Sequence, residues 1–311
     1  MNRLFISAIS ILLASPFASS QNSTFSFLQL DVGARASALQ GSFVSITNDP
    51  DAIFYNPAAL ATMERPRASF GYLDHLVDVS AGSFSFARSV EGLGQVGFGI
   101  VYVNYGTFTQ TDELSNIYGS FTSSDLEVVG GVGVPLDEQT MVGGSIKYIR
   151  SAIAEYRSTA FAFDAGILYA IPSENITIGA SIQNIGRQLG AFDGTRESLP
   201  LDIRIGITKR PQHLPVLLNL NFHKLNESSA TLSDRFSAFT FGAEFLLSET
   251  VRLRVGYNNE QRRELKMGSS AAMAGFSIGG GILVRDYLVD YAFNSFGRIG
   301  GIHRFSLGIN L

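Results

Sequence analysis

Apolar and polar residues alternate along most of this chain, from Ala68 to Leu311. In residues 201–208, four aliphatic side chains alternate with an Asp, an Arg, a Gly and a Thr. Residues 251–258 repeat the pattern, with Val, Leu, Val and Tyr opposite two Arg, a Gly and an Asn. An alternation with a period of two predicts β-strands that have one apolar and one polar face.

Counting these segments predicts about fourteen strands, which turn residues separate. Single-chain bacterial outer-membrane barrels contain an even number of antiparallel strands. The predicted strands are 68–74, 79–88, 94–105, 124–134, 139–150, 160–171, 176–186, 201–210, 215–224, 236–247, 250–259, 274–283, 286–294 and 303–311. The count therefore fits a closed barrel.

The apolar face of these strands carries Phe, Ile, Leu and Val, and the charged residues lie on the opposite face. A soluble β-sandwich would also alternate, but its outward positions would carry the charges. No stretch beyond the N-terminus has the roughly 18 consecutive apolar residues that a membrane-spanning helix needs. In lipid, only helices and closed barrels satisfy all backbone hydrogen-bonding groups. The sequence therefore predicts an all-β fold, a transmembrane antiparallel β-barrel over 68–311.

The connections between the predicted strands alternate in length. Those after the even strands are tight, as at 135–138 and 172–175. Those after most odd strands are longer, at 106–123, 151–159, 187–200, 225–235 and 260–273. Short periplasmic turns and long external loops are typical of outer-membrane barrels. This predicts extracellular long loops and two periplasmic chain ends.

The N-terminal residues form two further segments. Residues 1–20 have a positive residue, Arg3, then an apolar run and a small-residue cleavage site, which is typical of a secretory signal peptide. Residues 21–67 are rich in turns, yet they contain eight large apolar side chains that need burial: Phe25, Phe27, Leu28, Leu30, Phe43, Ile53, Phe54 and Tyr55. We expect this segment to be a plug that folds into the barrel, rather than a loose periplasmic tail.

Composition agrees with an exported membrane protein. Charged residues make up only 16% of the chain, against about 25% in soluble proteins. There is no Cys, so neither a disulfide framework nor a lipidated cysteine exists. Removing residues 1–20 takes away Arg3 and leaves 22 basic against 27 acidic residues, a net charge of −5. Without a basic stripe, nucleic-acid binding is excluded.

Eight charged residues fall on the face predicted to line the barrel interior. They are Lys147, Asp164, Asp202, Arg204, Glu244, Arg252, Arg254 and Asp290. Lipid would not tolerate them, since an Arg at mid-bilayer on a barrel costs about 2–4 kcal/mol. An ion-selective pore usually has a ring of one sign. Four basic against four acidic side chains therefore favour ion pairs that hold the plug and the far wall.

Nothing in the sequence predicts an enzyme. A hydrolase needs a nucleophile next to a base. The four His, at 75, 213, 223 and 303, lie in connections or near strand ends and have no metal-ligand spacing. No nucleophile elbow or dinucleotide fingerprint is present. We therefore expect no catalytic residue, no metal and no cofactor.

Several blocks resemble a known family. Residues 27–30 and 34–41 are similar to the opening of the PorV/PorQ family of the type IX secretion system, whose members resemble FadL-type fourteen-stranded barrels. The Asn56-Pro57-Ala58 motif within 51–60 is shared with the FadL hatch. Blocks at 104–121 and 183–210 place the chain nearer PorQ than PorV members. The likeness covers the mature chain, with two departures: Gln40 replaces an expected Gly, and the C-terminal residue is not aromatic.

This resemblance implies a non-enzymatic role. PorQ-like barrels are taken to hold a surface protein, PorZ, at the outer membrane, in an attachment complex that also contains PorU and PorV. External loops of a rigid barrel would provide such a docking surface. The longest loop, 106–123, carries the candidate docking residues Phe108, Asp112, Glu113, Tyr118 and Phe121. The alternative is that the aromatic residues here belong to the membrane-interface girdle, which fits the adjoining Tyr105 equally well. The alternative function is FadL-like transport of hydrophobic small molecules across the outer membrane.

Overall fold

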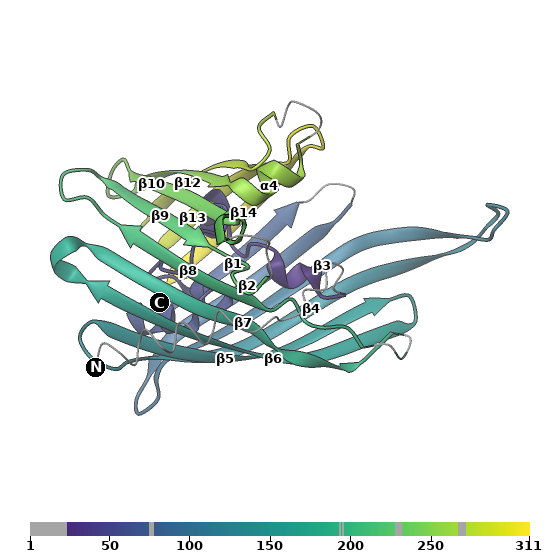
Figure 1. Ribbon diagram of the computed structural model, residues 1–311, viewed down its shortest axis with the longest axis horizontal. Helices are drawn as coiled ribbons and strands as arrows, with labels where there is room; N and C mark the ends of the chain where they lie inside the picture. Colours follow the sequence, from purple (N-terminus) through teal and green to yellow (C-terminus); the bar gives the residue numbers. More distant parts are fainter. Residues whose placement is uncertain (1–23, 75–77, 193, 195, 228–231, 267–271) are drawn as a thin grey trace.

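The computed structural model describes residues 24–311, apart from 75–77, 193, 195, 228–231 and 267–271. Residues 1–20, the predicted signal peptide, lie outside the described residues. The described chain forms fourteen strands (Figure 1). These are β1 Arg67–Asp74, β2 Ser80–Val90, β3 Gly94–Thr111, β4 Ile117–Pro135, β5 Thr140–Ile153, β6 Tyr156–Ile171, β7 Ile176–Gly190, β8 Asp202–Lys209, β9 Val216–Phe222, β10 Phe239–Leu246, β11 Val251–Asn258, β12 Phe276–Val284, β13 Tyr287–Ser295 and β14 Gly301–Asn310.

The strands form one closed antiparallel barrel in which each strand pairs with its sequence neighbours. Closure comes from β1, which pairs with β2 on one edge and with β14 on the other, where Arg67 lies opposite Asn310. Closure removes the free sheet edges that lipid could not satisfy. The predicted fold class, a transmembrane antiparallel barrel of about fourteen strands, is confirmed.

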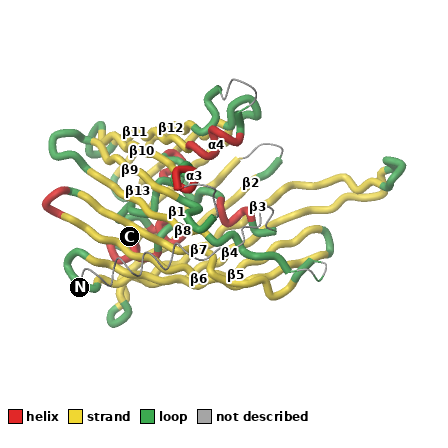
Figure 2. The backbone as a smooth tube through the Cα atoms, viewed as in Figure 1, coloured by secondary structure: helices red, strands yellow, loops and turns green. Residues whose placement is uncertain are grey.

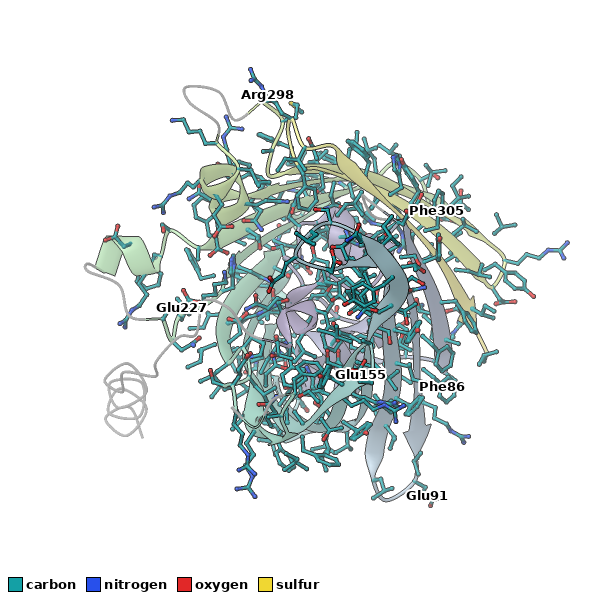
Figure 3. The ribbon with its side chains drawn as sticks, turned by 90° about the vertical axis from the view of Figure 1, so that its right-hand side faces the viewer. Phe86, Glu91, Glu155, Glu227, Arg298 and Phe305 are labelled. Atoms are coloured by element: carbon teal, nitrogen blue, oxygen red, sulfur yellow. The ribbon has the colours of Figure 1, made fainter. Side chains whose placement is uncertain are left out.

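The outside of the barrel is apolar and the inside is charged. Phe305 is 51% exposed, and Figure 3, viewed from the right-hand end of Figure 1, shows Phe86 and Phe305 on the outside of the ring of strands. On the same strand, Arg304 faces inward and is only 6% exposed. Such an outer surface would be unstable in water and is suited to lipid.

Two of the predicted long loops are wrong. Residues 106–123 are mostly strand, because β3 and β4 continue as a hairpin whose turn occupies only 112–116. Thr, Phe, Tyr and Ser fill this region, and such residues favour strands or are tolerated in them. The hairpin extends far beyond the other strands (Figure 1). The predicted loop 151–159 is wrong for the same reason, since β5 and β6 are joined by a tight turn at Ala154 and Glu155.

Short turns of the predicted kind follow the even strands, and Arg67 and Asn310 lie at that same end of the barrel. The opposite end holds the connections after odd strands, which include α3 Leu232–Arg235 and α4 Asn259–Glu264. A 3-10 turn, η4, covers Pro172–Glu174. Helices long and apolar enough to cross a membrane are not found in the described part of the chain.

Residues 24–66, here called the inner segment, lie within the ring of strands (Figures 2 and 3). They contain η1 Ser26–Gln29, α2 Ala34–Ala38, η2 Pro50–Phe54 and η3 Pro57–Thr62. The helix η3 packs on β3–β6, and α2 packs on β11–β14. The inner segment therefore touches opposite walls. Of its eight apolar residues that were predicted to be buried, six belong to the core, and Leu28 and Leu30 pack against it; the six are Phe25, Phe27, Phe43, Ile53, Phe54 and Tyr55.

Local sequence explains these short helices. Asp49 and Asn56 each cap a helix, accepting hydrogen bonds from the N–H groups of Asp51 and Ala58, and each is followed by a Pro at the first helical position. After α2 the chain turns sharply through Gln40, whose φ of 55° is in the left-handed region. A glycine is favoured at such a position. Gln40 is the residue that replaces the Gly expected from the PorV/PorQ resemblance. A long side chain therefore occupies a position with a strained backbone.

Candidate functional site

The Asn56-Pro57-Ala58 motif joins the inner segment to the wall. Asn56 Nδ2 donates hydrogen bonds to the carbonyl oxygens of Val44, at 2.8 Å, and Ile167 on β6, at 3.2 Å. Its Oδ1 accepts from the N–H of Ala58 at 3.1 Å. One buried side chain therefore caps η3, folds the inner segment on itself and attaches it to the barrel.

Glycines in the wall make room for this motif. A Cβ atom at Gly143 on β5 would lie well inside 3.0 Å of the Pro57 backbone, and one at Gly166 on β6 would overlap Asn56 Oδ1. Cβ atoms essentially never make contacts that short. These two wall positions therefore accept only glycine while the motif is in place.

A second attachment uses Arg35 of α2. Its Nε donates to Glu244 Oε2 on β10 at 2.9 Å, and its Nη1 donates to Asp49 Oδ2 at 3.0 Å. The carboxylate of Glu244 also accepts from Arg254 Nε on β11 at 3.0 Å. Arg254, which is fully buried, reaches Asp290 on β13 at 2.5 Å. The barrel interior therefore contains a chain of alternating charges that runs from the inner segment across β10–β13.

The structure places the eight predicted lumen charges in three groups. Glu244, Arg254 and Asp290 form the network just described, and Arg252 is at its edge, 3.9 Å from Glu244. Lys147 and Asp164 are paired at 3.0 Å elsewhere in the wall, and Lys147 also contacts Glu127 at 3.2 Å. Asp202 and Arg204 pair at 2.7 Å on β8. Among the ion pairs of the described residues, those of the first group reach the inner segment, through Arg35.

Beside the Asp202–Arg204 pair lies a cluster that involves α4. Glu260 of α4 accepts from His223 Nε2 at 2.9 Å and from Lys224 Nζ at 2.7 Å. Burial by itself would raise the pKa of Glu260, but hydrogen bonds from His223 and Lys224 outweigh it and hold that pKa at about 2. These contacts fix α4 over the end of the barrel that carries the longer connections.

Asp51 in η2 is an unusual buried carboxyl group. It accepts hydrogen bonds from Ser85 Oγ at 2.6 Å and Ser69 Oγ at 3.3 Å. Burial, and after it the neighbouring Asp49, raise its pKa to about 7, because the two serine hydrogen bonds oppose the rise only in part. Asp51 is therefore a group in the interior that titrates near neutral pH.

The candidate docking residues lie on the β3–β4 hairpin. Phe108 and Phe121 face each other across the strands with ring centroids 5.2 Å apart. The Asp112 carboxylate organises the turn by accepting from the N–H groups of Leu114 and Asn116, at 2.9 and 2.8 Å. Glu113 is exposed in the turn, and Tyr118, on β4, is 63% exposed. The hairpin thus presents aromatic side chains outside the barrel.

The interior contains small cavities, the first two of which share Leu30, Asp31 and Arg304 in their lining. One, of about 230 Å³, is lined largely by polar and charged side chains between the inner segment and β8–β11. Another, of about 30 Å³, lies between residues 30–34 and strands β1, β2, β3 and β14; its lining is mostly apolar, including Leu73 and Ala81, but it also contains Asp31 and Arg304. A third, of about 20 Å³, lies by Asp49 and Asp51. Among the described residues, no group of three or more His, Cys, Asp or Glu side chains could hold a metal ion.

Sequence reasoning missed three charged residues that matter here: Arg35, Asp49 and Glu127. Glu127 gave a usable signal, since it follows Asp125 at a spacing of two and so lies on the same inward face of β4. Arg35 and Asp49 lie outside the alternating region, and only the fold shows that they meet Glu244. A lone Arg among the small residues of 34–38 was the available hint.

Comparison with known proteins identifies the fold. No protein-family model and no curated protein matches the sequence. The fold is similar to that of the toluene transporter TbuX of Ralstonia pickettii, with a TM-score of 0.60 and 12% identity over 89% of this chain and 97% of that one. It is also similar to that of the Pseudomonas putida toluene transporter TodX, with a TM-score of 0.57 and 12% identity over 89% of this chain and 96% of that one. For the monoaromatic hydrocarbon channel CymD the TM-score is 0.57 and the identity 11%, over 90% of this chain and 97% of that one.

These similarities show that the chain has a FadL-like barrel fold, as the sequence predicted. At 11–12% identity they show the fold alone. The neighbours themselves are named as toluene transporters and a monoaromatic hydrocarbon channel. Membership of the PorV/PorQ family stays a prediction.

Proposed function

We propose that this chain is an integral outer-membrane protein that docks a surface-exposed protein through its β3–β4 hairpin. The observation that carries the proposal is the apolar surface of the hairpin tip. The hairpin projects beyond the barrel, and three large side chains near its tip are exposed: Leu114 by 83%, Ile117 by 73% and Tyr118 by 63%. Exposed apolar and aromatic side chains on a rigid support are typical of protein interfaces.

The interior supports docking more than passage of an apolar compound. The inner segment is attached to two walls by buried hydrogen bonds and ion pairs, so moving it would leave buried charges without partners. The cavity of about 230 Å³ is polar, whereas sites for hydrophobic ligands are lined mainly by apolar side chains. A barrel filled in this way is a stable base for an external surface.

The sequence resemblance suggests the partner. The PorV/PorQ likeness points to the attachment complex of the type IX secretion system, with a protein similar to PorZ on the hairpin and PorU and PorV in the same complex. In this interpretation the long connections are extracellular and both chain ends are periplasmic. Outer-membrane lipid covers the apolar face, and no nucleic acid takes part.

A double substitution, Leu114→Ser with Tyr118→Ser, tests the proposal. The tagged barrel is extracted gently from its native outer membrane, and the proteins that co-purify are quantified by mass spectrometry. We expect the wild type to retain a surface protein in near-stoichiometric amount and the double variant to lose most of it. Leu93→Ser is the matched control, because Leu93 is 62% exposed but lies in a short turn at the opposite end. Equal retention by all three proteins would contradict docking at the hairpin.

A second candidate function, transport of hydrophobic small molecules, is the one that the fold comparisons favour. The named ligands of the neighbours are toluene and monoaromatic hydrocarbons. The apolar cavity of about 30 Å³ supports it, because its lining combines inward residues such as Leu73 with outward residues such as Tyr72 and Phe305. It would have to enlarge to admit an aromatic ring.

Toluene uptake separates the two functions. Cells that express the wild type are compared with cells that express Ala81→Phe, which fills the small apolar cavity. Transport predicts that radiolabelled toluene enters faster with the wild type and that Ala81→Phe removes this gain. Docking predicts no gain in uptake over cells without the barrel. A gain that the hairpin variant preserves would establish transport in its place.

A further inference from the structure

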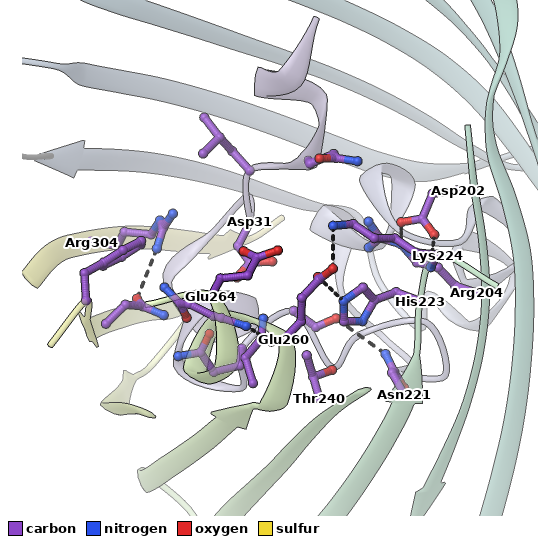
Figure 4. Close-up of a pocket in the computed structure, with 18 residues that line it drawn as sticks. Asp31, Asp202, Arg204, Asn221, His223, Lys224, Thr240, Glu260, Glu264 and Arg304 are labelled. Carbon is purple, nitrogen blue, oxygen red and sulfur yellow. Dashed lines mark hydrogen bonds and ion pairs between the residues drawn. The ribbon is translucent and has the colours of Figure 1, made fainter. Parts of the chain in front are cut away.

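The cavity of about 230 Å³ lies at the end of the barrel that carries the longer connections. Residues of the inner segment, including Asp31 and Gln40, form one side (Figure 4). The wall residues Thr240 and Arg304 and the α4 residue Glu264 form the other. The volume is below the ~300–1,000 Å³ of sites for drug-sized ligands. It suits a small ligand of about one ring.

Most of the charges around this cavity are already paired with each other. Asp202 pairs with Arg204, and Glu260 pairs with Lys224 and His223. Asp31 and Arg304 both line the cavity, but no ion pair joins them. Within the described part of the chain, the Asp31 carboxylate makes no hydrogen bond or ion pair with another side chain. The cavity therefore keeps two carboxylates that no ion pair of the described residues engages, Asp31 and Glu264, together with the Arg304 guanidinium.

Three residues that line this cavity also carry a buried polar atom without a partner among the described residues: Gln40 Nε2, Thr240 Oγ1 and Arg304 Nε. The exposed fractions of these residues are 4%, 4% and 6%. A buried polar atom without a hydrogen bond costs about 1–3 kcal/mol, so three around one cavity call for a ligand. Gln40 adds a backbone strain, since it holds a left-handed φ that Gly would adopt freely.

We propose that this cavity binds a sugar residue. Its hydroxyl groups would accept hydrogen bonds from the Gln40 amide and the Arg304 guanidinium, and would donate to the Asp31 carboxylate. Thr240 can do either. A hydroxyl group both donates and accepts, which matches a lining that offers unpaired donors and an unpaired carboxylate together.

Other ligand classes fit less well. A hydrocarbon would leave all four polar groups unsatisfied. An anion would meet the carboxylates of Asp31 and Glu264, and a cation would meet Arg304. A neutral polyhydroxylated ring avoids both conflicts. The sugar could be a free monosaccharide or one residue of a cell-surface glycan, and the chemistry of recognition is the same. This inference is independent of the docking hairpin, which lies outside the cavity.

Binding is measured on the purified full chain in lauryldimethylamine oxide, because a detergent with a sugar headgroup would compete. The probes are glucose, galactose, mannose and N-acetylglucosamine, followed by a lipid-free surface polysaccharide, by calorimetry and saturation-transfer NMR. We expect saturable binding of at least one probe. Binding of a monosaccharide indicates a free sugar, and binding of the polysaccharide alone indicates a glycan. Both support the proposal.

Two variants link binding to the cavity. Gln40→Gly and Thr240→Val should each weaken binding about fivefold to tenfold, the effect of one lost hydrogen bond. Gln40→Gly should leave the folded barrel at least as heat-resistant as the wild type, because glycine relieves the left-handed φ. Thr177→Val, on β7 near the opposite end, is the matched control and should bind normally. Absence of saturable binding to the wild type, or equal binding by the wild type and the Gln40→Gly/Thr240→Val double variant, overturns the proposal.

Discussion

The interior of the barrel and the β3–β4 hairpin differ in which side chains they bury and which they expose. Inside, charged side chains are buried and paired, as with Arg35, Glu244 and Arg254. Outside, the hairpin tip leaves large apolar side chains such as Leu114 uncovered. A membrane barrel has lipid around its wall, so apolar side chains there are covered, but a hairpin that projects beyond the wall has no such cover. The network around Glu244 is therefore paired within the barrel, whereas the apolar side chains at the hairpin tip are left uncovered.

Glu244→Gln should be the most damaging single change, because one carboxylate serves both Arg35 and Arg254. Removing one member of a buried ion pair costs about 3–5 kcal/mol. The folded, heat-modifiable band on a gel should disappear at a much lower temperature than in the wild type. Glu249→Gln, in an exposed turn, is the control. If the two variants melt alike, the interior network does not hold the barrel.

Asp51→Asn tests the interior by pH. The folded pKa of Asp51 is raised to about 7 from 3.8. The folded protein therefore binds more protons than the unfolded chain between about pH 4 and 7, and this residue's contribution to stability falls as pH rises through that window. The loss of stability that this residue causes across the window is at most about 4 kcal/mol. In urea unfolding, Asp51→Asn should gain stability over the wild type at pH 8 and not at pH 4. A gain of the same size at both pH values would contradict this.

Gly143→Val should prevent the Asn56-Pro57-Ala58 motif from reaching its place on β5. The added side chain meets the Pro57 backbone, and overpacking of this kind costs about 1–3 kcal/mol. We expect protease to cut the inner segment in the variant but not in the wild type. Gly130→Val is the control, because a Cβ at Gly130 would meet nothing within 4 Å. Cleavage in neither variant would show that the wall adapts.

Phe108→Ser with Phe121→Ser should have the smallest effect on the barrel. The stacked pair lies on the projecting hairpin, away from the core. The free energy of unfolding of the barrel should therefore stay within about 0.5 kcal/mol of the wild-type value. Amide exchange of residues 107–122 should rise, because the pair holds the two strands together. Destabilisation of the whole barrel would mean that the hairpin belongs to the same folding unit.

The sequence predicted the barrel well because alternation records which face meets lipid. The observed β1 begins one residue before the predicted strand, and β8 and β11 are each one residue shorter than predicted at both ends. The hairpin was misassigned for a physical reason. Beyond the membrane both faces of a strand meet water, so the alternation fades and residues 106–123 look like a loop.

The candidate site was less predictable. Lys147 and Asp164 were expected to face inward, but their pairing depends on the register between β5 and β6. The Arg35–Glu244 pair joins residues 209 positions apart, and no local pattern encodes such a contact. The left-handed Gln40 could be suspected only because a Gly was expected there. Tertiary contacts of the inner segment therefore lie beyond sequence reasoning.

A covalent lock on the inner segment tests most directly whether the protein works with a fixed interior. Ser45 and Thr208 on β8 have hydroxyl oxygens 2.8 Å apart, and the chain has no Cys of its own. Cysteines at both positions should form a disulfide that ties the inner segment to the wall. Retention of the surface partner is then measured in native membranes before and after reduction. Docking on the hairpin predicts the same near-stoichiometric retention in both states. Retention that appears only after reduction would show that the inner segment must move, and would contradict it.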